Sequence, residues 1–201
     1  MDTHSPLGKR VEICGGIASG KTTLATLLRR ALLIPIMEDF RRNPFLTDFY
    51  ADPKTYALET ELSFLLQHYH AVKRARVHRT AVCDFSFFLD LAYANFTLSK
   101  QEGKHFRTLY RVLTGHLRPP SALIYLQCPA QVELRRIRAR RRAREKAISL
   151  GYVRGLDQEL SRLVGSLSAP PILTLDSHAL DFAHNLKHCS AVVTTVKQFL
   201  A

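Results

Sequence analysis

Five short apolar runs, separated by longer segments in which apolar residues recur at helical spacing, set the pattern of this chain of 201 residues. Such runs are typical of strands buried on both faces, and strands that alternate with helices predict a parallel sheet covered on both sides. The pattern predicts one α/β domain over residues 1–201 with a five-stranded parallel sheet. The predicted strands are Val11–Cys14, Leu32–Met37, Ala81–Asp84, Ala122–Cys128 and Ile172–Asp176.

The polar residues that follow these strands predict where a ligand binds. Right-handed crossovers bring the carboxyl ends of all parallel strands to one edge of the sheet, where ligands of such folds are bound. A glycine-rich loop follows the first strand, Glu38 follows the second, and Asp84 ends the third. We therefore expect these three features to lie together at this edge.

The loop after the first strand has the sequence of a phosphate-binding loop. Gly15 and Gly20 let the backbone turn its N–H groups toward phosphates, and the helix that follows adds its positive end. Lys21 can then reach the outer phosphates, and the Thr22 hydroxyl can join the shell of a magnesium ion. A glycine turn without a ligand is the alternative. The residues expected to bind ATP here are Gly15, Gly16, Ile17, Ala18, Ser19, Gly20, Lys21, Thr22 and Thr23.

The net charge of +12 changes this picture less than its size suggests. Seven arginines lie within residues 135–144, so the rest of the chain carries only +5. Because no glycine or proline interrupts residues 132–150, the cluster is predicted to be helical. An arginine-rich helix suits a lid over a triphosphate, and nucleic acid is not an expected partner. A basic nucleic-acid-binding protein with a regulatory ATP site is the alternative from another class.

Other features of the sequence narrow the class of protein further. No apolar run is long enough to span a bilayer, and Met1–Lys9 is too polar for a signal peptide, so we expect a cytoplasmic protein without membrane contact. The four cysteines show no metal-binding spacing and are expected to be reduced thiols. No Asn-Lys-x-Asp guanine-reading signature is present, which disfavours a GTPase.

Several segments, in order along the chain, resemble bacterial deoxynucleoside kinases, specifically the deoxyadenosine and deoxyguanosine kinase branch. Those similar to the acceptor site are Glu38-Asp39-Phe40, Asn43-Pro44-Phe45-Leu46, Phe49-Tyr50-x-Asp52-Pro53 and Glu61-Leu62-Ser63-Phe64-Leu65-Leu66. Spaced residues from Arg136 to Leu156 resemble the lid, placed at about 136–152, while Leu173-x-Leu175-Asp176 and Asp181-Phe182 resemble the adenine-side segment.

The resemblance implies a P-loop kinase fold and an activity in nucleotide salvage. ATP and Mg²⁺ would serve to phosphorylate the 5′-hydroxyl of a deoxynucleoside, expected to be a purine, in a homodimeric enzyme. A nucleoside monophosphate kinase or another small-acceptor kinase is the alternative, and it would need cations around the acceptor's own phosphate.

The resemblance also implies roles for individual residues. Glu38 would be the general base, and the alternative is a solvated loop carboxylate. Tyr50 and Glu145 would bind the sugar 3′-hydroxyl, and Asp84 would help Thr22 to hold magnesium. Alternatives are a core aromatic for Tyr50, an arginine partner for Glu145 and a strand terminator for Asp84. Residues implied to face ATP are Arg140 and Arg142, with Arg136, Arg138 and Asp176 beside them.

Two positions depart from the family pattern. Many members have an arginine directly after the acid, whereas Phe85 follows Asp84 here; Arg79, Arg138 or another lid arginine could replace it. Glu61 stands where many relatives have a base-reading glutamine. An ionised glutamate offers two acceptors, which suits the adjacent donors of guanine, although a simple pairing with a lid arginine is the alternative. The expected walls of the base site are Phe64, Tyr69, Phe85 and Phe88.

Overall fold

The sheet is parallel throughout, as the apolar runs predict. The computed structural model describes residues 8–31, 33–75 and 79–201. Its five strands are ordered β2-β3-β1-β4-β5. They span Arg10–Gly15 (β1), Ile34–Ile36 (β2), Ala81–Cys83 (β3), Ala122–Gln127 (β4) and Ile172–Asp176 (β5). The five predicted strands are therefore confirmed to within about two residues at each end, apart from Leu32, which lies outside the described residues.

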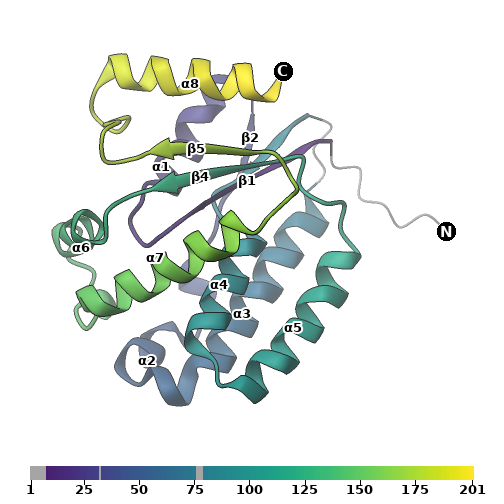
Figure 1. Ribbon diagram of the computed structural model, residues 1–201, viewed down its shortest axis with the longest axis vertical. Helices are drawn as coiled ribbons and strands as arrows, with labels where there is room; N and C mark the ends of the chain where they lie inside the picture. Colours follow the sequence, from purple (N-terminus) through teal and green to yellow (C-terminus); the bar gives the residue numbers. More distant parts are fainter. Residues whose placement is uncertain (1–7, 32, 76–78) are drawn as a thin grey trace.

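Helices cover both faces of this sheet (Figure 1). One face carries α1 (Lys21–Leu28) and α8 (Leu186–Leu200), and the other carries α3 (Pro53–Arg74), α4 (Phe87–Thr97), α5 (Lys100–Gly115) and α7 (Leu150–Gly165). Successive strand residues point to opposite faces: Ile13 packs in the core beneath α1 and α8, whereas Cys14 packs against α4 and α7. Because both faces are covered, apolar residues run continuously along the central strands rather than alternating with polar ones.

The carboxyl edge of the sheet carries the shorter elements. Here lie α2 (Leu46–Ala51), α6 (Ala130–Ala139) and the 3₁₀ turns Phe40–Arg42 and Ala143–Glu145. In Figure 1, α6 is seen beyond the arrowheads of β4 and β5. A further 3₁₀ turn, Arg29–Ala31, extends α1. The buried Glu12 of β1 accepts hydrogen bonds from the Ser86 hydroxyl and the Phe87 amide, which fixes the start of α4 next to β1. These two hydrogen bonds place Asp84 and Phe85 beside the phosphate-binding loop.

The prediction of one helix across the arginine cluster is wrong. The helix α6 ends at Ala139, Arg141 takes a left-handed conformation with φ of 50°, and α7 begins only at Leu150. Ser149 starts the second helix, since its side chain accepts a hydrogen bond from the Tyr152 amide. Between the two helices, Glu145 binds Arg140 and Arg142, and these ion pairs hold the chain in a tight loop.

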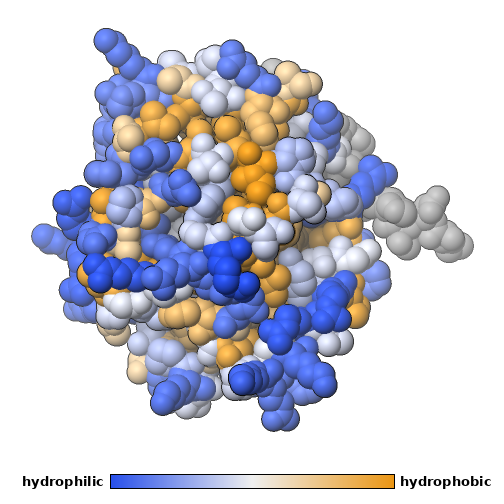
Figure 2. Space-filling model, in the orientation of Figure 1, coloured by the Kyte–Doolittle hydropathy of each residue, from blue (hydrophilic) through white to orange (hydrophobic). Residues whose placement is uncertain are grey.

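The outer surface fits this arrangement. On the face seen in Figure 2, hydrophilic side chains cover most of the surface, and apolar ones gather between α7 and α8, over the edge strand β5. Among the described residues, no helix is both long and apolar enough to cross a membrane. The four cysteines are free.

Candidate active site at the carboxyl edge of the sheet

A cavity of about 700 Å³ opens at the carboxyl edge, between the phosphate-binding loop, α2, α3, α4 and the arginine loop. It brings together residues from one end of the sequence to the other, including Lys21, Glu38, Glu61 and Glu145. The cavity thus joins the predicted triphosphate site to the predicted acceptor site. All the acceptor-side residues expected from the sequence line it except Tyr69, Asp84 and Phe88.

The phosphate-binding loop has the backbone that its glycines predict. Gly20 has φ of 108°, a conformation that residues with a Cβ rarely adopt, and it leads directly into α1. The Lys21 ammonium donates to the carbonyl oxygens of Gly15 and Gly16, both at 2.9 Å. To reach a bound phosphate, this ammonium exchanges carbonyl oxygens for phosphate oxygens by rotating its flexible stem.

Thr22 and Asp84 meet beside the loop. The Thr22 hydroxyl donates to Asp84 Oδ2 at 2.9 Å, and the other Asp84 oxygen accepts the Glu38 amide at 2.6 Å. Burial raises the pKa of Asp84, against the hydrogen bonds from Glu38 and Thr22. A hydroxyl and a carboxylate next to a triphosphate site are the oxygen donors that suit Mg²⁺, which takes few protein ligands. No group of three or more His, Cys, Asp or Glu side chains suited to a metal occurs among the described residues.

Glu38 is held by a residue that the sequence analysis missed. Its Oε1 lies 3.0 Å from Nε2 of His68, on α3, and its second oxygen accepts no hydrogen bond from the described residues. Burial acts to raise the pKa of Glu38, but the hydrogen bond and charge of His68 outweigh it, and the pKa lies below its ordinary value. Glu38 is therefore ionised at neutral pH and has one oxygen available to accept a proton.

His68 in turn is anchored on its other side. Its Nδ1 lies 2.9 Å and 3.0 Å from the two oxygens of Asp90, on α4. Burial acts to lower the pKa of His68, but Asp90 and Glu38 together raise it to about 10. The ring of Phe85 stacks on the imidazole at 4.0 Å between centroids with 3° between planes. The cation beside Glu38 is thus a histidine, and not one of the arginines that the sequence analysis considered.

The predicted sugar-binding pair lies at the lid side of the cavity. Both Tyr50 and Glu145 line it, and burial followed by the charge of Glu145 raises the pKa of Tyr50. Arg140 donates to Glu145 through Nε at 2.6 Å and Nη2 at 2.9 Å, and Arg142 donates to it at 3.3 Å. Arg142 and Arg144 also lie over the Phe40 ring, at 4.6 Å and 4.3 Å. The arginines are therefore arranged around one carboxylate at the mouth of the cavity.

Glu61 lies at the deep end of the cavity. Its side chain is buried, and the Thr97 hydroxyl lies 3.4 Å from Oε1. Burial, and then the charge of Asp90, raises the pKa of Glu61 well above its ordinary value. An ionised Glu61 was expected from the sequence, whereas this environment favours the protonated form. A protonated carboxyl offers one donor and one acceptor, as glutamine does.

Comparison with known proteins decides the family. The model of the deoxynucleoside kinase family matches residues 11–201. This chain belongs to the deoxynucleoside kinase family. It is 28% identical over 200 residues to a deoxyguanosine kinase of Bacillus subtilis (strain 168), covering 94% of this chain and 97% of that one. It is 30% identical over 156 residues to a deoxyadenosine kinase of Dictyostelium discoideum, covering 74% and 64% of the two chains.

Solved structures agree on the fold. The deoxyadenosine kinase from M. mycoides with bound dCTP matches with a TM-score of 0.80 at 16% identity, covering 94% of this chain and 99% of that one. The same enzyme with bound dATP matches with a TM-score of 0.78 at 17% identity, over 94% and 100% of the two chains. This deoxynucleoside kinase therefore has the P-loop kinase fold, and its family phosphorylates deoxynucleosides.

Some predicted site residues of the kinase lie elsewhere. Arg138 points away from the large cavity and donates to the Ile148 carbonyl, and the exposed Asp176 accepts the amides of His178 and Ala179. Phe88 packs in the core between α4 and α7, so it forms no wall of the base site. Tyr69 likewise packs in the core around α3 and α5, whereas Phe64 and Phe85 do line the cavity. These predicted site residues do not line the cavity because sequence spacing does not determine which side of a loop or helix faces it.

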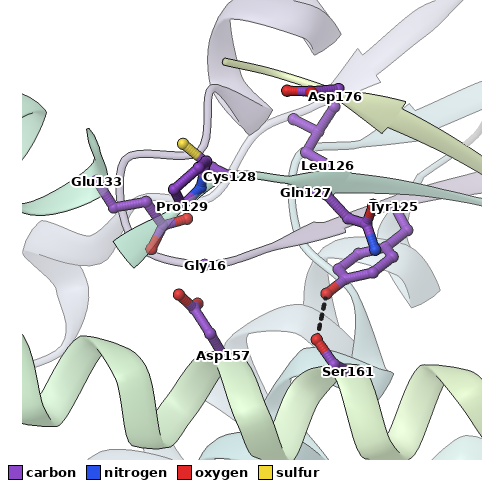
Figure 3. Close-up of a pocket in the computed structure, with 10 residues that line it drawn as sticks. All are labelled: Gly16, Tyr125, Leu126, Gln127, Cys128, Pro129, Glu133, Asp157, Ser161 and Asp176. Carbon is purple, nitrogen blue, oxygen red and sulfur yellow. Dashed lines mark hydrogen bonds between the residues drawn. The ribbon is translucent and has the colours of Figure 1, made fainter. Parts of the chain in front are cut away.

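A second cavity, of about 320 Å³, lies on the opposite side of the phosphate-binding loop (Figure 3). Glu133 of α6 and Asp157 of α7 point toward each other there, with Gly16 between them. Glu133 is buried, and neither of its carboxyl oxygens receives a hydrogen bond from a described donor. Burial, and then the charge of Asp157, raises the pKa of Glu133. We expect the two carboxyl groups to share one proton, since a second ionised carboxylate would meet the charge of the first.

Sequence reasoning about the kinase missed His68, Asp90, Glu133 and Asp157. One signal was available for His68: it follows Glu61 by seven residues on a predicted helix, which places both side chains on the same face. Nothing in the sequence pairs Glu133 with Asp157, because the two residues come from different helices and meet only across the loop.

Proposed function

We propose that this kinase transfers the γ-phosphoryl group of ATP to the 5′-hydroxyl of a purine deoxynucleoside. The observation that carries the proposal is the continuous cavity from Lys21 on the phosphate-binding loop to Glu38 and Glu61. It offers a cationic, amide-lined end for a triphosphate and an acidic, aromatic end for a nucleoside. The names of the related deoxyguanosine and deoxyadenosine kinases support a purine.

In this proposal, each residue acts on a defined group. The loop amides and Lys21 bind the ATP phosphates, and Glu38 accepts the proton of the 5′-hydroxyl through the oxygen that His68 leaves unbonded. Arg140 and Arg142 use their remaining N–H groups to stabilise charge on the migrating phosphoryl group. Mg²⁺, when bound at Thr22 and Asp84, neutralises phosphate charge. Tyr50 and Glu145 bind the 3′-hydroxyl.

The charge of the acceptor side disfavours a nucleoside monophosphate as acceptor. Glu38, Glu61, Asp90 and Glu145 all line the cavity, and the cations nearest to them are already paired: His68 with Glu38 and Asp90, and Arg140 with Glu145. On the acceptor side, a second phosphate would lie near the carboxylates of Glu38 and Asp90, whose nearest cation, His68, is already shared between them. An uncharged nucleoside avoids this repulsion.

The protonation of Glu61 sets the expected choice between purines. The ionised form accepts from N1–H and the 2-amino group of guanine, whereas the protonated form donates once and accepts once, which suits adenine. Asp90 raises the pKa of Glu61, and the charge of His68 lowers it. Raising the pH ionises Glu61 and should therefore raise kcat/KM for deoxyguanosine relative to deoxyadenosine.

A panel of four deoxynucleosides and their monophosphates, with ATP and Mg²⁺ at pH 6.5 to 9, tests this proposal. We expect turnover of purine deoxynucleosides and little turnover of monophosphates. The Glu61→Gln variant should lose the pH dependence of the guanine-to-adenine ratio and favour deoxyadenosine. A dominant pyrimidine activity contradicts the purine assignment, and a ratio that rises with pH in the Gln variant contradicts the role of Glu61.

We propose in addition that the kinase forms a homodimer through its helices. Leu109 and Val112 are half exposed and lie one turn apart on α5, and such apolar exposure supports a helix-mediated contact. Light scattering of the purified kinase measures the mass directly, and replacing both residues with glutamate should yield monomers.

A further inference from the structure

His68 lies in the core between two carboxylates, and these contacts indicate a role beyond packing. It is buried, and each of its ring nitrogens faces a different carboxylate. A neutral imidazole has one donor and one acceptor, so it can donate to only one of two carboxylates. Only the imidazolium form donates to Glu38 and Asp90 together. The high pKa of His68, about 10, agrees with this geometry.

The ring is also fixed in orientation. Phe85 stacks on one face, Phe64 lies over it at 6.0 Å between centroids, and Phe87 meets it edge-on at 6.4 Å. Asp90 binds Nδ1 with both oxygens, so the imidazole cannot flip without losing this pairing. Nε2 is therefore held in one direction, and that direction is toward Glu38.

Phe85 connects this arrangement to the departure seen in the sequence. It occupies the position after Asp84 where the resemblance leads one to expect an arginine, and here it supplies the ring on which the imidazole stacks. The other candidate cations lie elsewhere: Arg79 is exposed, Arg138 binds a backbone carbonyl, and Arg140 and Arg142 bind Glu145. Among the described residues, His68 is the cationic side chain bonded to Glu38.

We propose that His68, anchored by Asp90, is a positioning residue that orients the Glu38 carboxylate and supplies the cation in contact with it. Glu38 is then held at two points, by His68 at Oε1 and by Asp84 at its amide, so its second oxygen faces the acceptor hydroxyl. A carboxylate fixed in this way needs no reorientation before it accepts a proton. This inference rests on the proposed role of Glu38 as base.

Two variants of His68 separate positioning from packing. In His68→Gln the amide nitrogen lies near the position of Nε2 and can still donate to Glu38; in His68→Asn it lies near Nδ1 and can donate only to Asp90. Both remove the ring and its charge, so a purely structural role predicts equal losses. Positioning predicts that kcat falls about 30- to 100-fold for the Asn variant and about tenfold or less for the Gln variant. KM for ATP and for the deoxynucleoside should change less than about threefold.

A double variant, Phe85→Arg with His68→Asn, tests whether a different cation restores kcat. A guanidinium after Asp84 can take over the hydrogen bond to Glu38, so we expect kcat to recover at least about tenfold. The matched control is His70→Asn, the same substitution on an exposed turn of α3, which should leave kcat within about twofold of the wild type. Melting temperatures of all variants, measured with ATP, check that each is folded.

Three results overturn the inference. These are equal kcat losses in the Asn and Gln variants without rescue, a loss confined to KM for the deoxynucleoside, and a kcat of the Asn variant within threefold of the wild type. The same assays keep the proposed function separate. A wild-type protein without deoxynucleoside turnover contradicts the function, and a fully active Glu38→Gln variant contradicts the base. The His68 variants test the positioning role when the wild type turns over deoxynucleosides and the Glu38→Gln variant has lost activity.

Discussion

Two pairs of carboxyl groups flank the phosphate-binding loop, each with one buried member, Asp90 or Glu133, and their surroundings differ in one respect. On the acceptor side, Glu38 and Asp90 have His68 between them. In the other pair, Glu133 and Asp157 point toward each other beside Gly16, and no cation of the described residues lies between them. Lys21 and Arg136 lie near enough to lower the pKa of Glu133, but Lys21 donates to backbone carbonyls and Arg136 to Ser177 and to other acceptors away from Glu133.

The pKa of each carboxyl group depends on its hydrogen-bond donors as well as on its burial. Burial acts to raise the pKa of every carboxyl in both pairs, yet that of Glu38 ends below its ordinary value because of His68. Asp90 keeps a raised pKa even though His68 opposes it, and Glu133 keeps a raised pKa for want of a donor. Contact with His68 thus lowers the pKa of Glu38, so that it is a base at neutral pH, but it does not offset burial at Asp90.

Glu38→Gln is the substitution with the largest expected effect, because it removes the ionised carboxylate of the acceptor-side pair. The amide keeps the shape of the side chain but cannot accept a proton from the acceptor hydroxyl. We expect kcat to fall at least about a hundredfold with little change in ATP affinity, measured by steady-state kinetics and by nucleotide binding. Turnover near that of the wild type would remove Glu38 as the base and leave its low pKa without a function.

The sequence predicted the parts of the site that depend on short segments. The phosphate-binding loop, Glu38 and Asp84 each follow a buried strand, so local pattern and the geometry of parallel sheets place them together. The arginine loop could not be predicted in the same way. Its residues favour a helix, and the break at Arg141 comes from Glu145 binding Arg140 and Arg142, which propensity does not include.

His68 shows the second limit of sequence reasoning. Its function depends on Glu38, 30 residues earlier, and on Asp90, 22 residues later. The missing arginine after Asp84 indicated that a cation had to come from elsewhere, but arginines were the only candidates considered. A histidine on a mostly apolar helix face looks like core until its two partners are in place.

Asp90→Asn tests whether Asp90 stabilises the charged form of His68, because asparagine has nearly the size of aspartate but carries no charge. His68 then faces a neutral amide on one side, and its pKa should fall by at least about one unit from about 10. NMR titration of the His68 imidazole measures this shift, with the exposed His70 as an internal control. We expect kcat to fall about tenfold, less than for Glu38→Gln, because the bond to Glu38 persists. An unchanged pKa would mean that Asp90 does not stabilise the imidazolium form.

Glu133→Gln tests the other side of the loop, where the expected effect is on stability. The folded state raises the pKa of Glu133, so its protonated form contributes stability that is complete below the unfolded-state pKa and is lost as pH rises through the folded-state pKa. Between pH 6 and pH 9, this group should lower the free energy of unfolding of the wild type by at most about 1.4 kcal/mol per pH unit. Urea unfolding at several pH values measures the slope.

The Gln variant should flatten this slope, since glutamine keeps a donor toward Asp157 at every pH and ionises at none. Glu59→Gln, on an exposed turn of α3, is the matched control and should leave the slope unchanged. Activity at neutral pH should change less than about threefold, because Glu133 and Asp157 do not line the large cavity. If the wild type shows no greater loss of stability with pH than the Gln variant, the two carboxyl groups do not share a proton, and the contrast with Glu38 must have another cause.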